Sequence, residues 1–133
     1  MRTYDPDVIV VYIGSNDIDN HFQHRRFFYI VKDNMKKLGE RLQGYTTNRR
    51  AEVIYMTIEQ RAKPRGTTRS AYKSRRNRMN VVLRNSREMN LCFNFQSDAH
   101  FAPDGIHFNQ EDYREMANRI LAKVEAYAYT QGW

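Results

Sequence analysis

The stretch VIVVYIGSND at residues 8–17 decides the fold that we expect for this chain. Its first six residues are all apolar and mostly β-branched, whereas a strand with one side in water would alternate apolar and polar residues. The run stops at Gly14, and three polar residues follow. We therefore predict a strand over residues 7–13 that is buried on both faces and ends in a polar turn.

Strand-like and helix-like segments then alternate along the chain. Residues 51–58 and 91–95 are two further apolar runs typical of buried strands. After each of the three strands, apolar residues recur at the spacing of an amphipathic helix. The three helical stripes consist of Phe27, Val31, Met35, Leu38 and Leu42; of Tyr72, Arg76, Met79, Leu83 and Ser86; and of Tyr113, Ala117, Ile120, Val124 and Tyr127.

The helix ends are signalled by their own residue types. Gly44 is expected to end the first helix. The second helix is expected to be capped by Thr67 or Thr68, and the last by Asn109, because these side chains can accept a hydrogen bond from a free backbone N–H.

The order of the segments predicts the fold class. Three strand–helix units in succession indicate an α/β fold, with three parallel strands and helices that cover the sheet. The length suits one domain, and we treat residues 1–133 as a single unit. Parallel sheets bind their ligands at the carboxyl ends of the strands. The polar clusters at residues 14–17 and 98–107 each follow a strand, so we expect both at that edge.

The positive charge of the chain is concentrated in one place. The chain has 22 Lys and Arg residues against 15 Asp and Glu residues, and ten of the cations lie in the basic segment (residues 61–87), which has no acidic residue. Such a segment is typical either of a solvated helix face or of a surface that contacts nucleic-acid phosphates. Its only aromatic residue is Tyr72, so it lacks the stacking platforms of a single-strand binder.

Composition also limits the class of protein. The longest apolar run has six residues, at positions 8–13, far short of the roughly 20 that cross a bilayer, so we expect no membrane span. The single cysteine, Cys92, cannot form an internal disulfide, and packing must hold the fold together. Nothing in the sequence predicts a cellular location.

Two short clusters carry residue types suited to catalysis. In the motif DGIH, the carboxylate of Asp104 can hydrogen-bond Nδ1 of His107, which fixes the tautomer and leaves Nε2 as a general base. In the motif GSND, the amide of Asn16 can donate to a developing oxyanion, and Gly14 permits a tight turn and a close backbone approach. Each cluster taken alone also fits a plain turn or helix cap.

Together the two motifs resemble those of the SGNH (GDSL-type) hydrolases, which are esterases and lipases on a flavodoxin-like sheet. A strand followed by G-x-N-D, and D-x-x-H just before the last helix, appear here in the order of that family. The resemblance implies acyl-ester hydrolysis without a cofactor or metal. It also implies that Asn16 and Gly14 form part of an oxyanion hole and that Asp104 and His107 support a serine nucleophile.

The sequence departs from that family in one respect. The family carries its serine in a G-D-S block and a further oxyanion glycine in a second block, both upstream of G-x-N-D, and neither block is present here. We therefore expect a partial SGNH domain that lacks its nucleophile and is inactive by itself. Ser15 and Ser97 are poor replacements, because neither position gives the side chain a reason to face His107.

Two other interpretations remain open at this point. Asp98, His100, Asp104 and His107 could together ligate a metal, although their spacing fits no compact zinc pattern. The chain could also be an inactive interaction module that associates with nucleic acid through the basic segment. The strand order 2-1-3-4-5 of the family would make residues 8–13 an edge strand here, and such an edge favours self-association or complementation by another chain.

Overall fold

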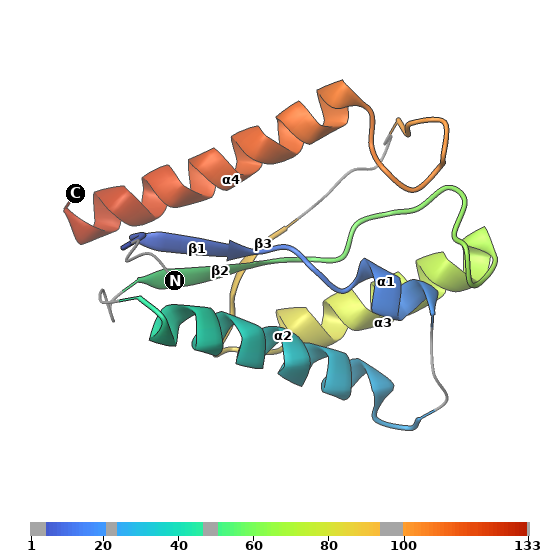
Figure 1. Cartoon of the computed structure of the whole chain (residues 1–133), viewed down its shortest axis with the longest axis horizontal. Helices are drawn as coiled ribbons and strands as arrows, with labels where there is room; N and C mark the ends of the chain where they lie inside the picture. Colours follow the sequence, from blue (N-terminus) through green and yellow to red (C-terminus); the bar gives the residue numbers. More distant parts are fainter. Residues whose placement is uncertain (1–4, 21–23, 47–50, 94–99, 133) are drawn as a thin grey trace.

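Three parallel strands form the sheet in the part of the chain that the structure describes (Figure 1). The computed structural model describes residues 5–20, 24–46, 51–93 and 100–132. The strands are β1 (Val8–Val11), β2 (Glu52–Met56) and β3 (Asn90–Cys92), in the order β1-β2-β3. The register pairs Val8 with Glu52 and Ile54 with Asn90. The predicted α/β class, the parallel pairing and the edge position of the first strand are confirmed.

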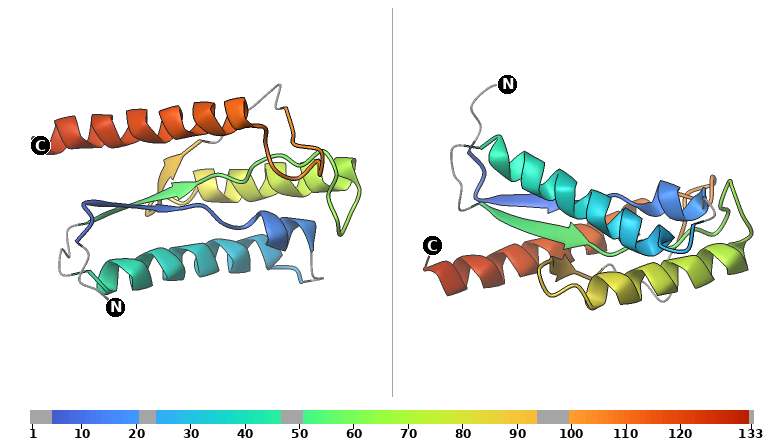
Figure 2. Two further views of the ribbon diagram at one scale, coloured as in Figure 1. Left: turned by 45° about the horizontal axis from the view of Figure 1, so that its top comes forward. Right: turned by 90° about the horizontal axis from the view of Figure 1, so that it is seen from below.

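Helices lie on both faces of this sheet (Figures 1 and 2). The four described helices are α1 (Ser15–Asp19), α2 (Phe27–Gly44), α3 (Arg69–Arg84) and α4 (Gln110–Gln131). Helices α2 and α3 cover one face, and α4 crosses the other. The one-turn helix α1 occupies the place where the sequence predicted only a turn. None of the described helices combines the length and the apolar character that a membrane span requires.

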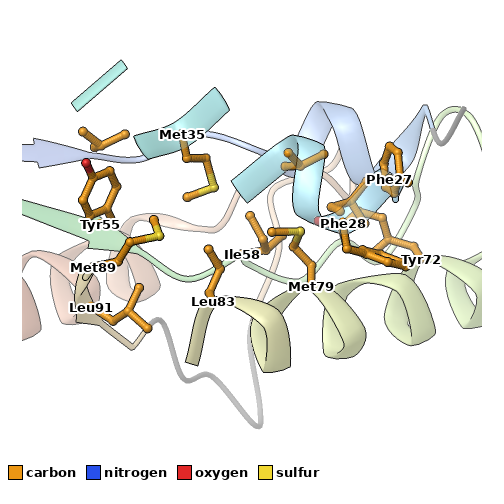
Figure 3. Packing of buried hydrophobic residues seen from close by; sticks show 13 residues of the cluster. Phe27, Phe28, Met35, Tyr55, Ile58, Tyr72, Met79, Leu83, Met89 and Leu91 are labelled. Carbon is orange, nitrogen blue, oxygen red and sulfur yellow. The ribbon is translucent and has the colours of Figure 1, made fainter. Parts of the chain in front are cut away.

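Successive residues of β2 supply two separate apolar clusters, because strand side chains alternate between the faces. Tyr55 faces α2 and α3 in the main core, where it packs with Met35, Met89 and Leu91 (Figure 3). Ile54 and Met56 belong to the smaller cluster on the other face. Partly buried residues of α4 close that second cluster: Met116, Ile120 and Val124.

The predicted strand over residues 7–13 is shorter and more exposed than expected. Val10, Tyr12 and Ile13 are 37–40% exposed, so the expectation of a strand buried on both faces is wrong. The physical reason is that β1 lies at the edge of the sheet. No described strand pairs with the outer side of β1, which leaves that side uncovered.

The second helical stripe is confirmed, since Tyr72, Met79, Leu83 and Ser86 are buried, whereas the first and third are each wrong in part. Phe27, Val31 and Met35 are buried, but Leu38 and Leu42 are more than a third exposed, because α2 turns Gly39 toward the sheet instead. The hydroxyl of Tyr55 donates to the Lys36 carbonyl (3.2 Å) and lies directly against Gly39. On α4, Ala117 is likewise exposed, and Met116 takes its place beside the sheet.

The predicted caps are borne out. The Thr68 hydroxyl accepts from the backbone N–H of Ala71 (3.2 Å) at the start of α3. The Asn109 side chain accepts from Asp112 N–H (3.0 Å) at the start of α4, and α2 ends at Gly44 as expected. The caps at Thr68 and Asn109 fix where two loops at the carboxyl edge of the sheet stop and where α3 and α4 begin.

Because Tyr55 approaches α2 closely, position 39 has no room for a side chain. A Cβ built on Gly39 would lie 2.2 Å from the Tyr55 hydroxyl oxygen, whereas nothing lies within 4 Å of one built on Gly44. We expect Gly39→Ala to lower the free energy of unfolding by about 1–3 kcal/mol through overpacking. Gly44→Ala should be neutral or slightly stabilising, because alanine is the better helix former.

Urea unfolding of the two variants beside the parent chain measures both effects. Equal stabilities for Gly39→Ala and Gly44→Ala would contradict the described contact between α2 and Tyr55.

Candidate functional site

Three loops gather at the carboxyl edge of the sheet (Figures 1 and 2). They are the turn into α1, the connection from β2 to α3 and residues 100–109 before α4. In Figure 1 all three lie at the arrowhead end of the strands. This is the edge where parallel sheets place their ligands, and the described residues of both polar clusters reach it.

Gly14 shapes the first of these loops. Its φ of +113° lies in the left-handed region, which a residue with a Cβ rarely adopts. A Cβ at this position would also lie 2.6 Å from Cδ1 of Ile58, so the turn packs tightly under the end of β2. The chain can therefore reverse directly after β1 and present Asn16 at the surface of α1.

A buried arginine holds the Asn16 side chain in place. Arg61, which is 8% exposed, donates through one terminal nitrogen to Asn16 Oδ1 (2.7 Å) and to Ser15 Oγ (3.1 Å). A guanidinium has only donors, so the amide atom that faces it must be the oxygen. The Asn16 NH₂ group consequently faces away from Arg61.

Asp19 balances the charge of Arg61. The second terminal nitrogen of Arg61 lies 2.5 Å from Asp19 Oδ2, and the carboxylate also accepts from the backbone N–H groups of Arg65 (2.9 Å) and Gly66 (2.6 Å). Burial alone would raise the pKa of Asp19, but these two N–H groups and the guanidinium together lower it. The carboxylate therefore stays ionised and ties α1 to the loop after β2.

The sequence gives little sign of this pair. Arg61 counts as one of ten cations in the basic segment, and Asp19 as one more polar residue after the GSND motif. The one available signal is position, since Arg61 closely follows the second apolar run and thus reaches the same edge as the GSND turn.

The DGIH motif forms the histidine–carboxylate pair that its spacing predicts. Asp104 Oδ2 lies 2.5 Å from His107 Nδ1, and Asp104 Oδ1 accepts from the backbone N–H groups of Ile106 (2.9 Å) and His107 (3.0 Å). The hydrogen bond from the His107 side chain, followed by the two backbone N–H groups, lowers the pKa of Asp104. An ionised Asp104 holds the proton of His107 on Nδ1 and leaves Nε2 as the acceptor.

One short segment contacts both clusters. The carbonyl of Gly105 accepts from the backbone N–H groups of Ala62 (2.8 Å) and Lys63 (2.9 Å), while Arg61 holds Asn16. Gly105 has a φ of +67°, and a Cβ there would lie 2.5 Å from the Lys63 side chain. Residues 61–63 thus connect the turn that bears Asn16 to the loop that bears His107.

The alternative site residues lie elsewhere or outside the described residues. Ser15 accepts from Arg61, and no hydrogen bond joins it to His107 within the described part of the chain. Ser97 and Asp98 lie outside the described residues. Among the residues that are described, no group of three or more His, Cys, Asp or Glu side chains could hold a metal ion.

At least half of the ten cations in the basic segment contact the protein itself. Arg61 pairs with Asp19, Arg75 donates to the Ile18 carbonyl (3.2 Å) and Arg76 donates to the Ile58 carbonyl (2.9 Å). Two further guanidinium groups lie over aromatic rings, Arg78 on Phe28 and Arg84 on Phe93. These contacts make the segment partly structural, and nucleic-acid binding by residues 61–87 stays a prediction.

A cavity of about 560 Å³ lies at the opposite edge, where β2 and β3 begin. It is lined in part by Lys36, Glu40 and Glu88, and the lysine pairs with both acids (3.9 and 3.8 Å). Because its charges compensate one another and it lies at the amino ends of parallel strands, we place the candidate site at the carboxyl edge instead.

An open parallel sheet with helices on both faces and a polar site at its carboxyl edge defines a protein of the α/β class. The chain belongs to the GDSL-like lipase/acylhydrolase family, whose model matches residues 2–120. No curated protein matches the sequence. A crystal structure of a putative acylhydrolase from Bacteroides fragilis has the same fold, with a TM-score of 0.62 and 18% sequence identity. The match covers 92% of this chain and 62% of that one.

The Asp19–Arg61 pair is the most testable feature of the site. Asp19→Asn keeps the size of the side chain but leaves a buried guanidinium without its counter-charge, which should lower the free energy of unfolding by about 3 kcal/mol. Asp17→Asn is the matched control, because Asp17 is exposed on the same short helix and should change stability by no more than about 0.5 kcal/mol.

Urea unfolding between pH 7 and pH 3 separates the two variants further. The pKa of Asp19 is lower in the folded chain, so its stabilising effect is present above the unfolded value of about 4 and is lost as the pH falls. The difference in the free energy of unfolding between the parent chain and Asp19→Asn should therefore become smaller in acid. If this difference is absent at pH 7, or if it becomes larger in acid, the ion pair is contradicted.

Proposed function

We propose that this chain supplies the acid–base pair and an oxyanion donor of a GDSL-type acyl-ester hydrolase site. What supports the proposal is the joint attachment of the Asn16 turn and the His107 loop to residues 61–63. Membership of the acylhydrolase family agrees with it. The substrate class is then a small acyl ester.

Each residue of the site has a distinct role in the proposed reaction. His107 Nε2 takes a proton from the attacking hydroxyl and later gives it to the departing alcohol. Asp104 holds the imidazole in the required tautomer and stabilises its charged form. The Asn16 NH₂ group and the Gly14 N–H donate to the carbonyl oxygen as it becomes an oxyanion.

The attacking hydroxyl is the part that we assign to a residue outside this sequence. The sequence contains no Gly-Asp-Ser block, and the oxygen of Ser15 is engaged by Arg61. Without a serine nucleophile, the general base can activate only water, and the donor can stabilise only the oxyanion that water attack produces. The chain alone is therefore expected to give weak hydrolysis at most, because the covalent route is missing.

Hydrolysis of 4-nitrophenyl acetate by the purified chain tests these roles. We expect a weak rate above buffer that falls by at least about tenfold in His107→Ala, Asp104→Asn and Asn16→Ala, since each removes a proton transfer, its orientation or a donor. Ser15→Ala is the matched control and should keep the rate. A fluorophosphonate, which phosphonylates activated serines with loss of fluoride, should leave the chain unlabelled.

Strong activity that disappears in Ser15→Ala would overturn the assignment of the nucleophile. A rate that is unchanged in His107→Ala, with the fold intact by circular dichroism, would overturn the hydrolase site. If coding sequence upstream of Met1 carries a strand that ends in Gly-Asp-Ser, a chain extended by it should gain robust, fluorophosphonate-sensitive hydrolysis.

The uncovered side of β1 supports a second function, association with another copy of this chain. Val10, Tyr12 and Ile13 expose more than a third of their surface, and no described strand pairs with the outer side of β1. An apolar strand edge of this kind favours pairing with a further strand. We propose that two copies pair through residues 8–13.

Light scattering coupled to size-exclusion chromatography tests the pairing. The parent chain should be dimeric at high concentration, and Val10→Lys should make it monomeric, because a charged side chain disfavours pairing at the edge. Val81→Lys on α3 is the matched control, since Val81 is also exposed (49%) but lies away from β1. A parent chain that stays monomeric at all concentrations would contradict the proposal.

A further inference from the structure

A small cationic pocket adjoins the candidate site. Its cavity measures about 180 Å³ and lies between the loop after β2 and the first two turns of α3. The six lining residues are Gln60, Arg61, Arg69, Tyr72, Lys73 and Arg76. Four of these carry a positive charge, and none of the described residues that line the pocket is acidic. We call this cavity the Arg69 pocket.

The charges of the Arg69 pocket are only partly compensated. Asp19 neutralises Arg61, and Glu59 lies close enough to Arg76 to influence its charge. Arg69 and Lys73 are exposed and have no described acidic partner. The pocket therefore keeps a positive potential that an anion would offset.

The start of α3 strengthens that potential. A helix N-terminus carries partial positive charge and is usually balanced by Asp or Glu in the first turn. Helix α3 has no acidic residue there and begins with Arg69 instead. Lys73 and Arg76 follow on the same face at the spacing of one and two helical turns. This placement costs some helix stability, which is understandable if the residues serve a ligand.

Arg76 and Tyr72 give the pocket a rigid wall. The Arg76 Nε–H donates to the Ile58 carbonyl (2.9 Å), and the Tyr72 hydroxyl donates to the Glu59 carbonyl (2.8 Å). Tyr72 is 1% exposed, so its ring is fixed in the core. Burial lowers the pKa of Arg76, because the charged guanidinium lacks full solvation. A bound anion would stabilise that charge.

Arg61 joins the pocket to the proposed oxyanion donor. It lines the cavity and also holds the Asn16 oxygen at 2.7 Å. Within the described part of the chain, its buried Nε–H has no hydrogen-bond partner. A group bound in the pocket would therefore lie one side chain away from Asn16. The volume is below the roughly 300 Å³ of a pocket for a whole drug-sized ligand, so it suits one substituent of a substrate.

We propose that the Arg69 pocket binds an anionic group, a carboxylate or a phosphate, carried by the acyl ester. The planar guanidinium groups suit either group, because they match the geometry of both. The assignment to an ester rests on the proposed hydrolase function, whereas anion binding itself does not. The substrate class is then an ester with a negative charge close to the scissile bond.

Binding of inorganic phosphate to the full chain tests the pocket without turnover. Phosphate is titrated at constant ionic strength, and binding is followed by backbone amide shifts. We expect saturable binding with shifts at residues 60–76, weakened by about tenfold or more in Arg69→Gln/Lys73→Gln, which removes two charge-assisted partners. Lys37→Gln/Arg41→Gln on α2 removes the same charge from exposed positions and should leave binding unchanged.

Equal weakening of phosphate binding in both double variants would mean that phosphate responds only to the net charge of the chain. That result would overturn the proposed pocket. Absence of saturation would overturn it as well. Tight binding of a single-stranded oligonucleotide that both variants weaken equally, with no saturable phosphate site, would assign the basic segment to nucleic acid instead. Loss of fold does not confuse the result, because Arg69 and Lys73 are exposed and their removal relieves repulsion at the helix start.

A second experiment tests whether the pocket binds a free anion only or the charged group of an ester substrate. The rates of the neutral 4-nitrophenyl acetate and the anionic mono-4-nitrophenyl succinate are compared. A preference for the anionic ester that disappears in Arg69→Gln/Lys73→Gln supports the substrate assignment, and equal use of both esters overturns it. If neither ester is hydrolysed but phosphate binds saturably, the hydrolase proposal fails and the anion site stands.

Discussion

The buried ion pair between Arg61 and Asp19 is the constraint on which the carboxyl edge of this fold depends. One guanidinium connects the loop after β2 to α1, and its hydrogen bonds reach Asp19, Ser15 and Asn16 together. A buried charge without a partner is strongly destabilising, so the partners must stay close to one another. The same side chain decides which way the Asn16 amide points. A structural requirement of the fold therefore also orients the amide that we propose as the oxyanion donor.

The second half of the site is organised in a different way. Asp104 and His107 are local neighbours in an exposed loop, and their pairing needs only a short turn closed by two backbone N–H groups. The tertiary contact comes from the Gly105 carbonyl, which docks on residues 62 and 63. The loop is thus preformed by its own sequence and positioned by backbone hydrogen bonds, so sequence changes elsewhere in the core should affect it little.

These two kinds of organisation explain what the sequence could predict. Apolar patterns identified the three strands and the long helices, the residue types at the helix ends identified the caps, and the DGIH spacing predicted the Asp104–His107 contact. All of these are local properties of the sequence. The exposure of Leu38 and the burial of Gly39 follow from the reach of Tyr55 across to α2, which no local pattern records. The Arg61–Asp19 pair joins residues 42 positions apart, and so it needed the structure. The family match agrees with the resemblance read from the two motifs, while the roles of individual residues remain proposals.

The central claim is that Asn16 and His107 act on the same bound ester. A double-mutant cycle on ester hydrolysis tests this most directly, with Asn16→Ala, His107→Ala and the double variant measured beside the parent chain. If both side chains serve one transition state, each single substitution lowers the rate, and the double variant is slower than either single variant, because the donor and the base lower the same barrier separately. A rate that is unchanged in either single variant would mean that the two residues do not share a site, and would contradict the account.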